Sequence, residues 1–203
     1  KAHVLKSCAV HRKEAHIIAD TMKWEVGNGT LMKADLIVLD ILNTVNWTRP
    51  IYFAITTGND VYLNMMNYFQ LEGLTYRIVP IRNTDPADGG TYGHINTDIL
   101  YENLVNKFKW GNMDKPGVYL DETTLRQTRN FRNLFYRLSM KLITEGDTTR
   151  AVKALDRCME VMPSNNVPYD IFMMRIAEAY YTAGQTKKAT DLVNNLVDMA
   201  IEK

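Results

Sequence analysis

The stretch of residues 46–82 constrains the fold most, because it predicts a strand, a helix and a second strand in immediate succession. Pro50 fixes its own φ and disfavours helix at the preceding residue, so the apolar run 51–55 is predicted as a strand. Apolar residues then recur at helical spacing over 61–71, before a second apolar run at 74–81. Two strands joined by a crossover helix lie parallel, with both sheet faces covered. We therefore expect a small parallel-strand α/β layer.

The most regular predicted helix, residues 34–45, leads directly into this unit. Its apolar residues leave only a narrow polar stripe, formed by Asp40, Asn43 and Thr44. A helix that is apolar almost all the way round is typical of a buried element. We expect this helix to pack on the sheet.

The composition is that of an ordinary globular chain, with 46% hydrophobic and 23% charged residues. The net charge of +1 gives no bulk attraction to nucleic acid, so no nucleic-acid partner is expected. The longest apolar run, residues 36–45, is interrupted by Asp40 and is too short to cross roughly 30 Å of hydrocarbon, so we expect no transmembrane segment. The N-terminus carries no apolar signal segment, which indicates a cytosolic protein or a piece cut from a longer one.

The last third of the chain carries an internal repeat. Gly146 and Ala151 are matched 38 positions later by Gly184 and Ala189. A glycine turns the chain between two helices, and a small alanine lets the second helix approach the first. This pattern resembles the tetratricopeptide family over about residues 132–203. Two repeats seldom bury enough surface alone, so the array is expected to lean on the α/β part.

The resemblance implies two helical hairpins, at about residues 132–163 and 170–203. With the strand–helix–strand unit at 50–82, they predict an α/β domain over residues 1–120 and a helical region over 121–203. The expected fold class is α/β in the broad sense, or α+β, with a small sheet layer followed by an all-helical region.

One candidate ligand pocket lies where the two predicted strands end. Open α/β sheets bind ligands outside the carboxyl ends of their parallel strands. The polar residues that follow these two strands, and so form the candidate pocket, are Thr57, Asn59, Asp60, Arg82 and Asp85. A small sheet needs loops at these ends in any case, so an ordinary surface loop is the alternative.

A second candidate surface follows the long helix that precedes and enters the first repeat. Arg126, Arg129 and Arg137 lie along it with Arg132 and Lys141, spread over roughly half its circumference. Such a set is typical of the solvated face of an amphipathic helix. The alternative is a face for a partner or an anionic group, such as a phosphate or a lipid headgroup.

Metal and cofactor sites are not indicated. His11 and His16 are five positions apart, which places them on different faces of a helix and disfavours a zinc site. We expect no catalytic residue, no cofactor and no metal. Cys8 and Cys158 form no close-spaced pair, and each is expected to be an unpaired structural residue.

A longer resemblance rests on three segments, which read LIVLDIL at 36–42, NWTRPIYFA at 46–54 and FQLEGLTYRIVP at 69–80. Together they resemble the soluble C-terminal region of a bacterial multi-spanning membrane protein family of unknown function, which is similar to transmembrane protein O-mannosyltransferases. The resemblance implies that any glycosyl-transfer chemistry lies in the membrane part, so no catalytic residue carries over to this chain. It also implies a position on the extracytoplasmic, periplasmic face, with the membrane part of its own parent chain as partner. That compartment is oxidising, which leaves a disulfide between Cys8 and Cys158 open.

Three functions are consistent with the sequence. The first is a non-catalytic accessory domain of a membrane glycosyltransferase-like protein, which recognises a polypeptide acceptor or supports assembly. The second is a small α/β enzyme or ligand-binding domain that acts on a sugar or a phosphate. The third is a free-standing tetratricopeptide adaptor in the cytoplasm.

Overall fold

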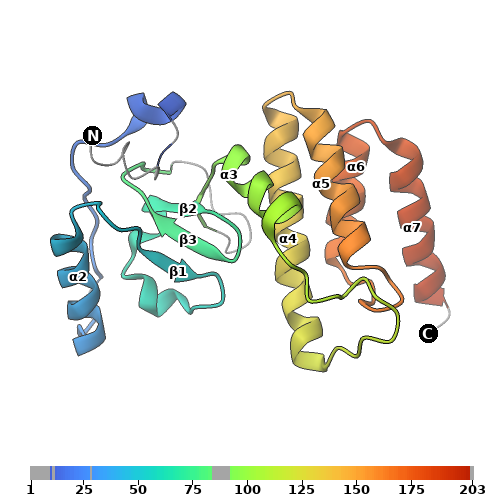
Figure 1. Ribbon diagram of the computed structural model, residues 1–203, viewed down its shortest axis with the longest axis horizontal. Coiled ribbons are helices and arrows are strands. Elements are labelled where there is room, and N and C mark those ends of the chain that lie inside the picture. Colours follow the sequence, from blue (N-terminus) through green and yellow to red (C-terminus); the bar gives the residue numbers. More distant parts are fainter. Residues whose placement is uncertain (1–9, 11, 28, 84–91, 202–203) are drawn as a thin grey trace. The chain divides into compact units, whose positions relative to one another are not determined.

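The computed structural model describes residues 10, 12–27, 29–83 and 92–201 of the 203-residue chain (Figure 1). The chain forms two compact units, residues 1–96 and 97–203. The sequence predicts the boundary after residue 120, whereas the structure divides the chain earlier.

The segment that follows residue 96 packs with the helices, which accounts for the earlier division. The ring of Trp110 lies 5.4 Å from the ring of Phe135, measured between centroids. The side-chain amide of Asn166 donates to the carbonyl oxygens of Met113 and Lys115, at 2.8 and 2.7 Å. Aromatic packing and hydrogen bonds from a side chain to backbone carbonyls therefore join this segment to the second unit.

Within the described residues, the first unit has four short strands in one sheet, in the order β1–β3–β2–β4. These strands are β1 (Tyr52–Ala54), β2 (Phe69–Leu71), β3 (Thr75–Ile78) and β4 (His94–Ile95). Strand β3 is antiparallel to both β1 and β2, while β2 and β4 pair in parallel. A small mixed sheet followed by helices confirms the α+β class. The prediction that the strands at 51–55 and 74–81 lie parallel is wrong.

The segment between these two strands explains the error, because it is not a crossover helix. It forms two short 3₁₀ turns, η2 (Asn59–Tyr62) and η3 (Met65–Tyr68). Leu63 and Asn64 separate the turns with φ of 50° and 58°, outside the range of a right-handed helix. The chain then enters β2, and Gly73, with φ of 124°, turns it into β3. The helix predicted over 61–71 is thus replaced by two turns and a strand.

Aromatic side chains fill the core beside the sheet. The ring of Tyr62 lies edge-on to the rings of Phe53, Phe69 and Tyr76, with centroids 5.6, 5.1 and 6.0 Å away. All four side chains are buried. At the N-terminal side, η1 (Arg12–Ile17) leads into Ile18, which forms a bridge with Ile81. A second apolar cluster consists of Val10, Ile18, Val79 and Ile81.

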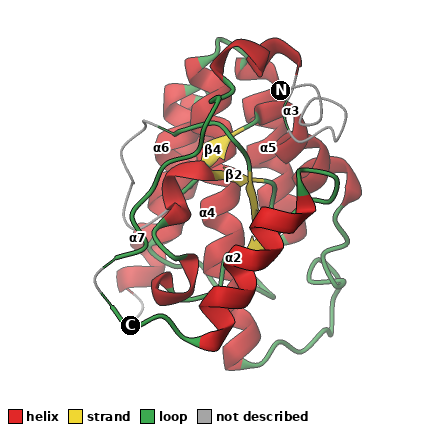
Figure 2. Ribbon diagram, turned by 90° about the vertical axis from the view of Figure 1, so that its left-hand side faces the viewer, coloured by secondary structure: helices red, strands yellow, loops and turns green. Residues whose placement is uncertain are grey.

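Helix α2 (Lys33–Val45) forms as predicted, but it is not buried. Figure 2 shows it as a long helix in the foreground. None of its residues is buried, and Leu36, Ile37 and Ile41 are 54%, 60% and 42% exposed. The prediction of a buried helix is therefore wrong, because an apolar pattern does not ensure that the same chain supplies something to cover it.

The second unit begins with α3 (Thr97–Tyr101), which continues into the π-helical segment η4 (Glu102–Lys107). Four longer helices follow: α4 (Glu122–Thr144), α5 (Thr148–Val161), α6 (Phe172–Thr182) and α7 (Thr186–Ile201). They form two hairpins, α4–α5 and α6–α7, and α6 also packs on α4 and α5.

The turns of the two hairpins match in detail. Gly146 and Gly184 adopt left-handed φ angles of 83° and 77°. The backbone N–H of Asp147 donates to Leu142 at 2.9 Å, and that of Gln185 donates to Tyr180 at the same distance. The first hairpin begins with α4 at Glu122, earlier than the expected 132, and the second lies within the expected 170–203. Their membership of the tetratricopeptide family stays a prediction.

Candidate functional site

The two strands expected to form the predicted pocket with their carboxyl ends, β1 and β3, are antiparallel. In an antiparallel pair, the carboxyl end of one strand lies beside the amino end of the other. Ala54 at the end of β1 therefore pairs with Thr75 at the start of β3. The carboxyl ends of these strands, which precede Thr57 and Arg82, point in opposite directions along the sheet.

The individual pocket residues have separate surroundings. The backbone N–H of Thr57 donates to the carbonyl of Ala54 at 3.1 Å, and the side-chain amide of Asn59 donates to the hydroxyl of Tyr92 at 3.0 Å. Asp60 lies exposed in the first turn of η2, and Arg82 is exposed beyond β3. The fifth member, Asp85, lies outside the described residues.

The turn between α2 and β1 joins this helix to the sheet. Asn46 and Trp47 both adopt left-handed backbone, with φ of 44° and 62°. This conformation is favourable for asparagine at a helix end but uncommon for tryptophan. The hydroxyl of Thr48 donates to the carbonyl of Val45 at 2.7 Å, and the indole of Trp47 packs against the cluster around Ile18.

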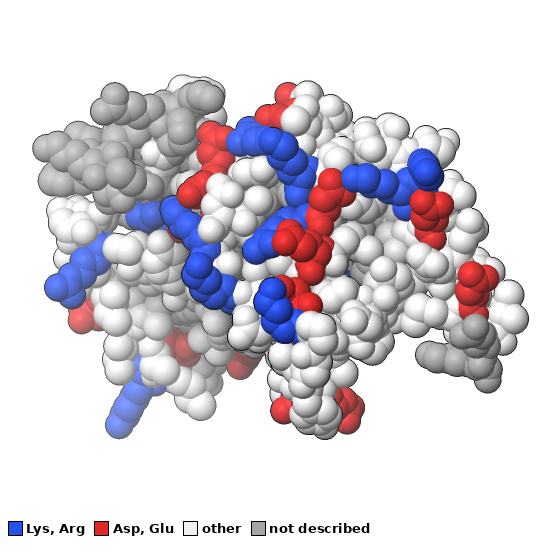
Figure 3. All heavy atoms as spheres, turned by 45° about the vertical axis from the view of Figure 1, so that its right-hand side comes forward, with Lys and Arg blue, Asp and Glu red and all other residues white. Residues whose placement is uncertain are grey.

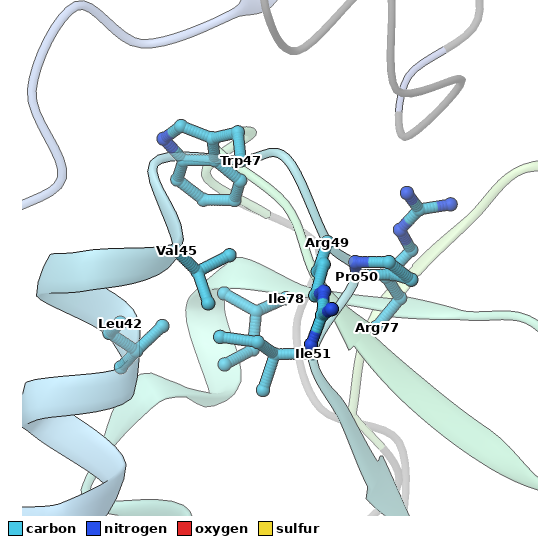
Figure 4. A pocket seen from close by; sticks show the side chains of 8 residues that line it. All are labelled: Leu42, Val45, Trp47, Arg49, Pro50, Ile51, Arg77 and Ile78. Atoms are coloured by element: carbon cyan, nitrogen blue, oxygen red, sulfur yellow. The ribbon is translucent and has the colours of Figure 1, made fainter.

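A small cavity lies under this turn. Figure 4 shows Leu42 and Val45 of α2 pointing towards Ile51 and Ile78, while Arg77 extends on the other side. The cavity holds about 20 Å³, which is the space of roughly one water molecule. The conspicuous 46–54 stretch is thus a packing and turn element in this unit, and its cavity is too small for a sugar or a phosphate.

A polar row crosses the face of the sheet opposite to the aromatic core. Gln70 and Tyr52 both lie opposite Arg77 in the strand pairing. Glu72 accepts hydrogen bonds from the Tyr52 hydroxyl at 3.0 Å and from the Gln70 amide at 2.7 Å, and it lies 3.6 Å from Arg77. The guanidinium of Arg77 also lies 5.7 Å from the ring centre of Tyr52. Gln70, Glu72 and Arg77 are all buried.

The polar row favours a structural role over an acid–base one. Burial, followed by the charge of Glu72, raises the pKa of Tyr52 above its ordinary value, so the phenol stays protonated at neutral pH. A protonated phenol donates to the Glu72 carboxylate and is a poor general base. Sequence reasoning missed this row, although the alternation of polar and apolar residues at 70–72 and 76–78 was a signal for it.

The structure brings two of the three predicted arginines together. Arg126 and Arg129 line a polar hollow of about 320 Å³ near the start of α4, whereas Arg137 lies two turns further along and is not part of it. The hollow also has carboxylates, from Glu122 and Asp170. Its charge is therefore mixed, and Figure 3 likewise shows basic and acidic side chains interspersed on the face it displays.

Arg132 differs from its neighbours because it is buried, at 1% exposure. Its guanidinium donates to the carbonyls of Val167 and Pro168, at 2.8 and 2.9 Å, and pairs with Asp170 at 3.2 Å. It thus ties the loop before α6 to α4, and it holds one wall of the polar hollow. The sequence carried a signal for this role, since Arg132 falls in register with the buried stripe of α4 that includes Phe135.

Further observations concern the cysteines, metal-binding clusters and membrane spans in the described residues. Cys158 is a free, buried thiol whose pKa is raised to about 12 by burial, while Cys8 lies outside the described residues. In the described part of the chain, no cluster of His, Cys, Asp and Glu could hold a metal ion. No helix there combines the length and the apolar character needed to cross a bilayer.

Comparison with known protein families finds one match, over slightly less than half of the chain. Residues 1–99 match the family described as TMEM260-associated domain 2. The match is a similarity to a domain named for its association with a transmembrane protein, and it ends close to the division between the two units. No curated protein and no solved structure matches the chain.

Proposed function

We propose that this chain is a non-catalytic accessory domain of a membrane glycosyltransferase-like protein, and that α2 is the surface by which its first unit docks onto the membrane part. The family match of residues 1–99 supports the association with a membrane protein. The glycosyltransferase-like character rests on the resemblance of the segments around residues 46–54. The surface itself rests on the structure of α2.

The uncovered apolar face of α2 is the observation that carries this proposal. Burying a Leu or Ile side chain completely is worth about 1.5–3 kcal/mol relative to leaving it in water. Leu36, Ile37 and Ile41 each leave about half of their surface unburied. Val45 and Leu42 make the contacts of α2 with the sheet. The exposed side chains of Leu36, Ile37 and Ile41 are therefore not needed for this packing. A partner that covers them gains the apolar burial that the described residues of the first unit do not supply.

The geometry of the first unit gives less support to an enzyme. The predicted strand-end pocket depended on parallel strands, and β1 and β3 are antiparallel. The buried carboxylate of Glu72 already accepts hydrogen bonds from Tyr52 and Gln70. These groups stabilise the sheet and do not leave an obvious place for a substrate. A non-catalytic role follows more directly from such a unit.

Photo-cross-linking tests the docking surface. A benzoylphenylalanine replaces Ile37 in the intact gene product, in its native membrane, and a matched variant carries it at the exposed Lys187 of α7. We expect a cross-link from position 37 to a membrane-embedded segment, found by mass spectrometry, and none from position 187. Absence of a membrane part in the gene product would favour the free-standing adaptor and contradict the proposal, as would equal labelling at both positions.

The side of the membrane is a separate part of the proposal. The resemblance supports an extracytoplasmic, periplasmic position, and a fusion of alkaline phosphatase to the C-terminus tests it. This reporter is active only where its disulfides form, outside the cytoplasm. High activity supports the extracytoplasmic side, whereas activity only from a cytoplasmic reporter fused at the same point contradicts it.

A polypeptide or anionic acceptor is a second candidate ligand, at the polar hollow of α4. Arg126 and Arg129 supply positive charge there, and Arg129 already lies 3.8 Å from Asp170. Titration with acceptor peptides and short anionic lipids should show saturable binding that is weakened by replacing both arginines with alanine. Arg137→Ala, on the same helix outside the hollow, is the matched control. If Arg137→Ala weakens ligand binding equally, the hollow is excluded as the binding site.

A further inference from the structure

An apolar groove runs between α6 and α7 in the second unit. It has a volume of about 600 Å³. Its walls include Met174, Tyr181, Val193 and Val197, which are between 44% and 67% exposed. Large contiguous apolar surfaces of this kind are typical of sites that another protein element covers.

The first hairpin shows the same surface in a covered state. Its turn matches that of the second hairpin in backbone conformation and hydrogen bonds, so residues 38 positions apart occupy equivalent places. Leu155, the equivalent of Val193, is fully buried, whereas Val193 is 44% exposed. The equivalents of the other three wall residues are half-buried, and they are Tyr136, Ile143 and Met159.

Helix α6 is the element that covers the first hairpin. It packs on both α4 and α5. The guanidinium of Arg175 lies 5.4 Å from the ring centre of Tyr136, and the hydroxyl of Tyr180 donates to Asp156 of α5 at 2.8 Å. Its buried apolar residues include Met173, Ile176 and Tyr180, spaced at i, i+3 and i+7. An amphipathic helix is thus the shape that this kind of groove accommodates.

We infer that the α6–α7 groove binds an amphipathic helix of a partner protein, with apolar residues at i, i+3 and i+7 and a basic residue near Glu178. Glu178 lines the groove at the place where the first hairpin has Met140. The second groove therefore adds a carboxylate, which a basic side chain of the partner complements. The inference concerns the second unit alone and does not rest on the proposed function.

The test uses the whole chain and a helical probe copied from α6. The probe is a fluorescent peptide of residues 170–185 that carries Thr182→Lys. A lactam joins the side chain of this lysine to that of Glu178. The lactam lies on the side that is exposed in α6, and it is needed because short isolated helices are marginal in water. Fluorescence anisotropy should show saturable binding of this probe.

Two substitutions on α7 locate the binding site. Val193→Glu places a charge inside the groove and should weaken binding at least about tenfold, because the charge loses water when the helix docks. Asn195→Glu adds the same charge to an exposed position outside the groove and should leave binding unchanged. Val197→Glu repeats the first test, and circular dichroism verifies that each variant is folded.

Three results would overturn the inference. One is the absence of saturable binding by the unmodified chain, and another is equal weakening by Asn195→Glu. The third comes from sedimentation velocity: a concentration-dependent dimer that Val193→Glu abolishes, and that excludes the probe, would assign the groove to a second copy of the chain.

Discussion

Helices α2 and α5 have similar lengths, 13 and 14 residues, and opposite environments. Helix α5 buries five residues, whereas α2 buries none. Yet α2 is apolar over most of its circumference, and α5 has a polar face with Lys153 and Glu160. The helix with more apolar surface is thus the less buried one. The difference teaches that a helical pattern predicts the helix itself, while burial depends on whether a second element is present to cover it.

The contrast gives α2 a different physical role from α5. Helix α5 is held by the packing of α4 and α6 within the same unit. Helix α2 has a capping interaction at its start, where the carboxylate of Asp35 accepts from the N–H of Met32 at 2.8 Å, and an anchoring turn at its end. The interactions at both ends therefore hold α2 in place. Its outer face is exposed and could bind a partner.

The largest expected effect is a loss of stability when a buried side chain of α5 is shortened. Leu155→Ala removes a fully buried side chain from α5 and should lower the free energy of unfolding by about 2–5 kcal/mol. Urea denaturation followed by circular dichroism measures it. Val193→Ala at the equivalent, exposed position of α7 is the control, and it should cost less than about 1 kcal/mol. Similar losses for the two variants would show that the two hairpins are equally covered.

The second effect concerns the buried arginine of α4. Arg132→Ala leaves the carbonyls of Val167 and Pro168 without their donor, and should cost about 2–3 kcal/mol. Arg129→Ala removes an exposed arginine on the same helix, and it should cost less than about 1 kcal/mol. The same urea measurement compares them, and a loss for Arg129→Ala as large as that for Arg132→Ala would remove the distinction between them.

The third effect is a pH-dependent helix cap. The carboxylate of Asp147 accepts a hydrogen bond from the backbone N–H of Arg150 at 3.0 Å, which lowers the pKa of Asp147 below its ordinary value of 3.8. A lowered pKa in the folded state means that the cap stabilises α5 above that ordinary value and loses its effect as the pH falls through the lower, folded pKa. Asp147→Ala should therefore cost about 1 kcal/mol at pH 7, and less on acidification. A cost that stays constant from pH 6 to below 3.8 would contradict this explanation.

The smallest expected effect is on α2. Ile37→Gln should change the free energy of unfolding by less than about 0.5 kcal/mol, because this side chain is 60% exposed beside the described residues of the first unit. The same substitution in the intact gene product should reduce the association of this domain with the membrane part. A loss of stability in the chain alone that approaches the loss for Leu155→Ala would show that α2 is already covered.

Much of the architecture could be predicted from the sequence where local signals are strong. The glycines at 146 and 184 mark both hairpin turns, and α2 begins and ends close to where its pattern predicts. The 61–71 segment was misread, because its apolar spacing suits a helix while the backbone at Leu63 and Asn64 turns left-handed. Gly73 ends a helix and turns a hairpin equally well, so it did not resolve the ambiguity.

The candidate site was less predictable, because it depends on which residues meet across the fold. The positive charge of Arg132 suggested a solvated face, and only its position in the buried stripe indicated otherwise. The contact of Glu72 with Tyr52 depends on the order of the strands, which a single sequence does not specify. The exposure of α2 depends on whether another element covers its apolar face, and the pattern of the helix itself carries no signal for that.

Cysteine labelling of α2 tests the central claim most directly. In a Cys8→Ser background, Ile37→Cys is alkylated with a maleimide in the 203-residue chain alone and in the intact gene product in its membrane. Lys187→Cys on α7 is the control, and Cys158 is buried and should react little. If α2 docks onto the membrane part, position 37 is labelled rapidly in the chain alone and at least about tenfold more slowly in the intact protein, while position 187 is labelled equally in both. Equally rapid labelling of position 37 in both would contradict the claim that α2 is a docking surface.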